Sequence, residues 1–214
     1  MKIRAAVISK PKLHWPVRNS VRFKRNKTET PGLQLLLLGL MVTSLFGGAV
    51  LYLLFSVSMQ PQLAAVYDVF CTMCNASWFI RLCAALLPTA GTGLLIVYFG
   101  VSPVSAFAVL PLVSLRCTAM GCVAAFLVKE FDKQGLTAYF AGLFPGRAVA
   151  FGALFLLSVH ALRCSRYIKS CLNRDSLKNE RWAVSYIRAC LPALLMLVGA
   201  ALLDASLRRL CRIA

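Results

Sequence analysis

Residues 135–167, GLTAYFAGLFPGRAVAFGALFLLSVHALRCSRY, form the stretch from which the fold of this chain is predicted. A short amphipathic piece precedes a break at Pro145-Gly146, and the apolar run that follows ends at a basic cluster. Between positions 144 and 162, the strongly polar side chains are one arginine, one serine and one histidine. Lipid offers the backbone no hydrogen-bond partners, so a run of this length is expected to cross a bilayer as a helix.

The composition of the whole chain is typical of a membrane protein. Of its 214 residues, 59% are hydrophobic and only 14% are charged, whereas a soluble domain carries roughly a quarter charged residues. The surplus apolar side chains must face lipid. The sequence therefore predicts one all-α, polytopic membrane domain.

The net charge of +17 is concentrated in three segments. Nine Lys or Arg lie in the first 31 residues, seven lie between Arg163 and Arg188, and three follow Asp204. These segments flank apolar runs, which favours topology and attraction to anionic lipid headgroups as their role. We therefore expect the bilayer, and not nucleic acid, to be the partner of these charges.

Five membrane spans are predicted, at residues 33–57, 80–99, 112–128, 144–162 and 187–207. The chain then divides into a basic cytosolic arm (1–31), a helical membrane domain (32–207) and a short basic tail (208–214). Positive charge favours the cytosolic side, so the amino terminus is predicted inside the cell and the carboxyl terminus outside. The three arginines of the tail run against this rule, and the two larger clusters outweigh them.

Two segments outside the spans are predicted to form short helices on the outer membrane surface. Residues 58–78 contain no Lys or Arg, and a helix at 63–76 would lie at the interface. The second segment is residues 129–142. Its apolar side chains, together with Leu143, recur at helical spacing: Leu136, Tyr139, Phe140 and Leu143.

The start of the third span determines the environment of Arg116. A helix from residue 104 would place Arg116 at the centre of the bilayer, where a charge is costly and usually functional. A helix that starts at Pro111, a residue favoured in the first turn, would let Arg116 reach the cytosolic face. The proline favours the second arrangement.

Small residues mark predicted helix-packing positions. Gly39, Thr43 and Gly47 form a stripe at four-residue spacing in the first span, where another helix could approach closely. The pattern indicates packing and does not identify the partner; a homo-oligomer is one open alternative. Further packing positions are predicted at Gly121, Pro145 and Gly146.

Cys71 and Cys74 form a CxxC pair on the predicted outer side. This spacing occurs in thiol oxidoreductases and in half of a zinc site, but no second ligand pair with suitable spacing follows. With nine cysteines in the chain, chance spacing between two structural cysteines is the alternative.

The ionisable residues of the spans do not predict a catalytic site. We expect His160 to be packed, Arg81 to reach the outer surface from its helix end, and Asp204 to face water or pair with Arg208. The sequence contains no GxSxG, HExxH, GxxxxGK[ST] or GxGxxG motif. It therefore predicts no enzyme, no cofactor and no metal.

A series of short motifs lies between Leu87 and Ser165: Pro88 with the glycines after it, the Phe99-Gly100-Val101-Ser102 step, Gly121, the Leu143-Phe144-Pro145 step and the Arg163-Cys164-Ser165 exit. In their order, these features resemble the stage II sporulation protein M family of bacterial multipass proteins. The family usually has an amide or a His-Gly pair after that last proline, where this chain has Gly146-Arg147.

The resemblance implies a non-catalytic membrane scaffold of forespore engulfment. Such a protein lies in the mother-cell septal membrane and localises partners that degrade peptidoglycan. Two other functions stay open: a permease-like subunit of an ABC-type transporter, with residues 101–111 and 163–188 as coupling contacts, and a thiol-redox protein that uses Cys71 and Cys74.

Overall fold

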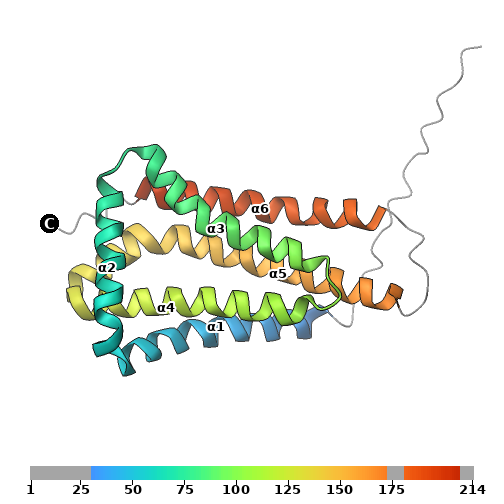
Figure 1. Ribbon diagram of the computed structural model, residues 1–214, viewed down its shortest axis with the longest axis horizontal. Helices are drawn as coiled ribbons and strands as arrows, with labels where there is room; N and C mark the ends of the chain where they lie inside the picture. The colour runs from blue at the N-terminus through green and yellow to red at the C-terminus, as the bar shows by residue number, and fades with distance from the viewer. Residues whose placement is uncertain (1–29, 173–180, 208–214) are drawn as a thin grey trace, which may run out of the picture.

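The computed structural model describes residues 30–172 and 181–207, and these residues form helices joined by short turns (Figure 1). The helices, in chain order, are α1 (Thr30–Leu54), α2 (Ser56–Asn75), α3 (Trp78–Gly100), α4 (Ser105–Ala138), the π-helix η1 (Tyr139–Leu143), α5 (Phe144–Leu172) and α6 (Arg181–Leu207).

Five of these helices are long and apolar enough to cross a membrane, which confirms the predicted all-α polytopic fold. They cover Gly32–Leu54, Trp78–Gly100, Ser105–Lys133, Phe144–Leu172 and Trp182–Leu207. Large apolar side chains on their outer faces are exposed, such as Leu35 (76%), Leu87 (80%) and Phe107 (83%). In a bilayer these side chains contact lipid, so their exposure carries no hydrophobic cost.

The predicted start of the third span at Pro111 is wrong. Helix α4 begins at Ser105 and continues through Pro111, because membrane helices tolerate the loss of one backbone hydrogen bond at a proline. Arg116 therefore lies eleven residues inside the span, about 16 Å along the helix axis at 1.5 Å per residue. The alternative start, which places Arg116 deep in the bilayer, agrees with the structure.

Helix α2 crosses one end of the bundle, here called the α2 end (Figure 1). Met59, Leu63 and Ala64 on its inner side pack against a cluster that includes Tyr52 and Phe126. The second half of α2 corresponds to the predicted interfacial helix. Its outer side exposes Val57 and Val69, whereas Val66 lines a small pocket with Leu63 and Phe126.

Polar contacts tie the α2 end together. Glu130 of α4 accepts hydrogen bonds from the Tyr52 hydroxyl and from Nε2 of Gln60, both at 3.3 Å. Lys129 lies over the Tyr52 ring, with its Nζ 5.7 Å from the ring centroid. A single carboxylate thus links α1, α2 and α4.

Helices α1 and α4 approach each other backbone to backbone at two glycines. A Cβ atom at Gly48 would collide with the Thr118 backbone, and one at Gly121 would collide with the Leu45 carbonyl. The hydroxyls of Ser44 and Ser114 lie 2.7 Å apart across the same contact. Close approach through small residues is the usual way in which membrane helices pack.

The predicted stripe of Gly39, Thr43 and Gly47 lies on a different face of α1. All three residues are exposed, and no heavy atom of the described chain lies within 4 Å of a Cβ placed at either glycine. The buried positions of α1 include Leu37, Met41 and Gly48. Packing at the stripe therefore stays a prediction about a second molecule.

The predicted packing positions Pro145 and Gly146 lie in the first turn of α5. Gly146 is buried, and a Cβ atom there would lie 3.1 Å from the carbonyl oxygen of Ala200 in α6. Helices α5 and α6 are thus close at this point.

Helix α4 changes direction at Asp132, which has φ 48° and ψ −126°. This backbone region strongly favours glycine, and a residue with a Cβ there stores about 1–3 kcal/mol of strain.

We expect Asp132→Gly to raise the melting temperature of the purified protein in detergent. The exposed neighbour Lys133 is the control, since Lys133→Gly in a helical position should destabilise by about 1 kcal/mol. An Asp132→Gly protein that melts below the parent protein would contradict this account.

Candidate functional site

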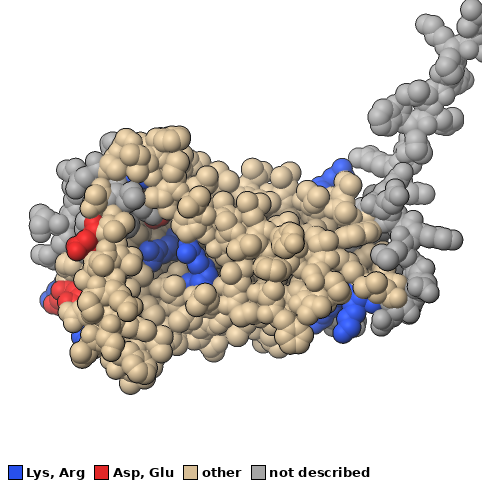
Figure 2. Space-filling view, in the orientation of Figure 1, with Lys and Arg blue, Asp and Glu red and all other residues tan. Residues whose placement is uncertain are grey.

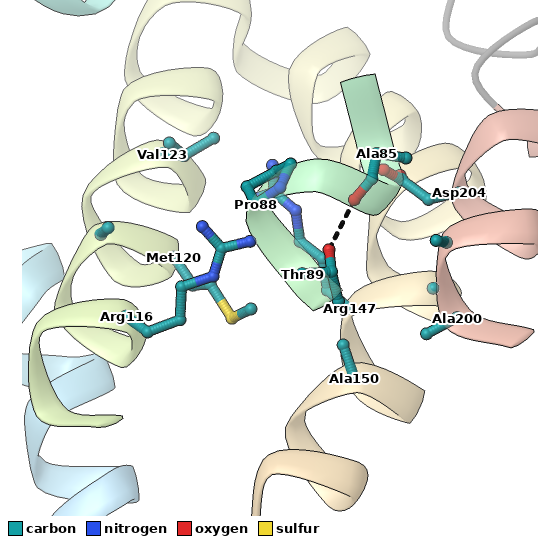
Figure 3. A pocket seen from close by; sticks show the side chains of 13 residues that line it. Ala85, Pro88, Thr89, Arg116, Met120, Val123, Arg147, Ala150, Ala200 and Asp204 are labelled. Atoms are coloured by element: carbon teal, nitrogen blue, oxygen red, sulfur yellow. Dashed lines mark hydrogen bonds between the residues drawn. The ribbon is translucent and has the colours of Figure 1, made fainter. Parts of the chain in front are cut away.

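A cavity of about 210 Å³ lies inside the bundle, and four spans line it (Figure 3). Helix α3 contributes Ala85, Pro88 and Thr89, and α4 contributes Arg116, Ala119, Met120 and Val123. Helix α5 contributes Gly146, Arg147 and Ala150, and α6 contributes Ala200, Ala201 and Asp204.

The space exists because most lining positions carry small side chains. Five alanines and one glycine face it, with at least one of these six on each of the four helices. Pro88 interrupts the backbone hydrogen bonding of α3 at the same level, and the Thr89 hydroxyl donates to the Ala85 carbonyl at 2.7 Å (Figure 3). These small side chains leave a hollow between the four helices.

Charged side chains from three helices enter this hollow. Arg116 extends from α4 toward Pro88, Arg147 comes from α5 and Asp204 comes from α6 (Figure 3). Arg116 is repelled by Arg147 and attracted by Asp204. Its Nε is buried and has no hydrogen-bond partner among the described residues. The lining thus holds two guanidinium groups and one carboxylate.

A third arginine, Arg81, is buried in α3, four residues before the cavity residue Ala85. Arg81 is 1% exposed and lies one helical turn before Ala85, on the same face of α3. Its Nε and Nη1 have no hydrogen-bond partner among the described residues. The expectation that Arg81 reaches the outer surface is therefore wrong, since the surrounding helices enclose its side chain.

The expectation that Asp204 faces water is also wrong. Its side chain forms part of the cavity wall, and its Oδ1 is buried. Helix α6 turns this residue inward because Ala200, Ala201 and Ala205, which share or neighbour its face, are buried. Arg208, the other expected partner, lies outside the described residues.

The cavity opens on the apolar side of the bundle. Figure 2 shows basic side chains in a hollow of an otherwise uncharged face, in the part of the bundle nearer to α2. Pro88 of α3 and Ala119 of α4 line the cavity and are also exposed, so the opening lies between these two helices. A molecule in the bilayer could reach the arginines through it.

A second cavity, of about 460 Å³, lies toward the end opposite α2. Its lining is mostly apolar and comes from α1, α4 and α5, with Arg166 and Lys169 as its charged residues. An acyl chain beside an anionic headgroup would suit such a lining, in agreement with the predicted attraction to anionic lipid.

The other predicted chemical groups do not form a site in the described part of the chain. The side chains of Cys71 and Cys74 lie outside it, while His160 is half-buried in α5. Six described cysteines are free thiols, and four of these are buried. Among the described residues, no group of three or more His, Cys, Asp or Glu side chains could hold a metal ion.

The sequence contained one signal for the arginine cavity. Of its 24 Lys and Arg, 19 belong to the three basic clusters, and the other five are Arg81, Arg116, Lys129, Lys133 and Arg147. Three of these five are therefore isolated arginines inside apolar runs. Such residues are expensive in lipid and usually face the interior of a bundle.

Comparison of the chain with protein-family models, with curated proteins and with solved structures found no match. The site must therefore be interpreted from its own residues.

Proposed function

We propose that this chain is a non-catalytic membrane scaffold that recruits partner proteins on the outer side of the membrane. In this proposal the amino terminus is cytosolic, and α2 lies on the outer membrane surface. The resemblance to the stage II sporulation protein M family supplies the biological setting, which is a mother-cell septal membrane and partners that degrade peptidoglycan.

The observation that carries the proposal is the placement of α2. This helix of 20 residues lies across the end of the bundle, outside the five spans. Its inner side is held by packing and by Glu130, while Val57 and Val69 are exposed on its outer side. A fixed helix with an exposed apolar side supports a role as a contact surface for another protein.

The permease-like alternative loses one of its two expected coupling elements. Residues 101–104 form a turn, and the rest of segment 101–111 belongs to α4. The segment is therefore not a separate re-entrant piece. The thiol-redox alternative depends on two side chains outside the described ones, so we retain it only as a hypothesis.

The proposal is tested by deletion in the native host, which it requires to form spores. A membrane dye should show septa that form but do not migrate around the forespore. Complementation with a Val57→Ser/Val69→Ser double variant should fail in the same way, because the exposed side of α2 would lose its apolar contacts.

The matched control is Val184→Ser, which removes an exposed valine (59%) from the first turn of α6, at the opposite end of the bundle. This variant should complement fully. Normal engulfment in the deletion strain would contradict the scaffold function, and full complementation by the α2 variant would contradict the role of α2.

A further inference from the structure

The cavity between α3, α4, α5 and α6 contains more positive than negative charge. Arg116 and Arg147 line it, and Asp204 is the one acid among its lining residues. With the side chains in their usual charge states, the lining carries a net charge of +1. The buried Arg81 adds another positive charge one turn before Ala85.

An arginine cannot relieve this excess by losing its proton, because guanidinium stays protonated in proteins. An arginine at the centre of a span costs about 2.5–3.5 kcal/mol on insertion scales, and Arg116 lies eleven residues inside α4. The Nε of Arg116 is also buried without a hydrogen-bond partner among the described residues. A bound anion would supply both the missing charge and the missing acceptors.

Guanidinium groups favour a particular kind of anion. Their planar array of N–H donors matches the oxygens of phosphate and carboxylate groups in a bidentate fork. The 210 Å³ volume equals about seven waters at roughly 30 Å³ each, so a phosphate group would leave room for an attached substituent. The small lining residues at Ala119 and Ala150 leave this space open.

The opening between α3 and α4 shows how such a group could enter. Pro88 and Ala119 are exposed where the cavity meets the apolar outer face. Leu87 and Leu115, also exposed at 80% and 70%, lie next to this opening in sequence and would contact lipid tails. A phosphate group that carries an apolar tail therefore fits both the cavity and its surroundings.

We infer that this cavity is a binding site for a phosphate-bearing anion, with Arg116 and Arg147 as its principal donors. The phosphate belongs either to a lipid headgroup or to a small soluble molecule. The site is separate from the contact surface on α2, so its existence does not depend on the proposed scaffold function.

The test uses the full chain in neutral detergent and compares it with Arg116→Gln. One arm titrates inorganic phosphate and follows the melting temperature. The other arm reconstitutes the protein in phosphatidylcholine bilayers with increasing phosphatidylglycerol and counts retained phosphatidylglycerol by native mass spectrometry. Arg188→Gln, which removes an exposed arginine of α6, is the matched control.

We expect at least one probe to bind the parent protein and to bind Arg116→Gln about tenfold or more weakly, since a charge-assisted hydrogen-bond pair is lost. Binding of inorganic phosphate alone assigns a soluble ligand, whereas binding of phosphatidylglycerol alone assigns a lipid. Arg188→Gln should bind like the parent protein.

Arg116→Gln is expected to fold, because it removes a buried cation that Arg147 repels. Phosphatidylglycerol bound at the second cavity should be retained less by Arg166→Gln and unchanged by Arg116→Gln, because Arg166 lines that cavity. Comparison of the two variants therefore distinguishes the two sites. The inference is overturned if neither probe binds, or if Arg116→Gln binds both probes as well as the parent protein does.

Discussion

Gly48→Leu is expected to prevent the bundle from assembling, whereas Gly47→Leu is expected to leave its stability unchanged. At Gly48 even a Cβ atom would collide with the Thr118 backbone of α4. Backbone atoms cannot move aside as a flexible side chain can, so α1 would have to separate from α4. Overpacking typically costs about 1–3 kcal/mol and occasionally more, and a clash with backbone belongs at the upper end of this range. The substitution would also displace the Cys122 thiol, which donates to the Gly48 carbonyl at 3.1 Å.

The measurement is the yield of monodisperse protein on size-exclusion chromatography in detergent, followed by the melting temperature. Gly47 is the control because it precedes Gly48, is exposed, and has no atom of the described chain within 4 Å of its Cβ position. A Gly48→Leu protein as stable as Gly47→Leu would show that α1 and α4 do not meet at this residue. If Gly47→Leu only changes the oligomeric state, a second copy packs on the predicted stripe.

Asp204→Leu is expected to be the most destabilising substitution among the cavity residues. It removes the one carboxylate of the lining and leaves Arg116 and Arg147 together in a mostly enclosed space. Breaking a buried charge arrangement by removing one partner costs about 3–5 kcal/mol. For a chain of this length, that loss lowers the melting temperature by roughly 10 °C.

A second substitution provides the critical comparison for Asp204. Adding Arg116→Leu to Asp204→Leu removes one of the two remaining cations, so the double variant should melt at a higher temperature than Asp204→Leu alone. The exposed acid Asp68 on α2 is the control, and Asp68→Asn should melt like the parent protein. Simple additivity of the two cavity substitutions would contradict an electrostatic coupling between Arg116 and Asp204.

The spans could be predicted closely because their signal is local. Residues 144–162 were predicted as a span, and α5 indeed begins at Phe144, although it continues to Leu172. The extension carries Arg163, Arg166 and Lys169. Long basic side chains can reach the headgroups from a helix end, so hydropathy alone places the end of such a helix too early.

The start of α4 was harder to predict because two local signals disagreed. Pro111 is typical of a first turn, but the apolar residues before it continue the same helix from Ser105. The tertiary structure resolves this conflict, because Val109 and Val113 on either side of Pro111 are both buried in the main core. Packing of these two valines offsets the single backbone hydrogen bond that the proline removes.

The amino-acid sequence by itself determined the all-α membrane class and the number of spans, because hydrophobic length and charge placement are properties of continuous segments. Only the tertiary structure decided which of the two glycines, Gly47 or Gly48, contacts α4. Successive residues of a helix point about 100° apart around its axis, so one of two neighbours can face lipid while the other is buried. The tertiary structure also decided that Arg116, Arg147 and Asp204 share one cavity. Those three residues come from three helices, and only the packing angles and rotations of whole helices bring their side chains together.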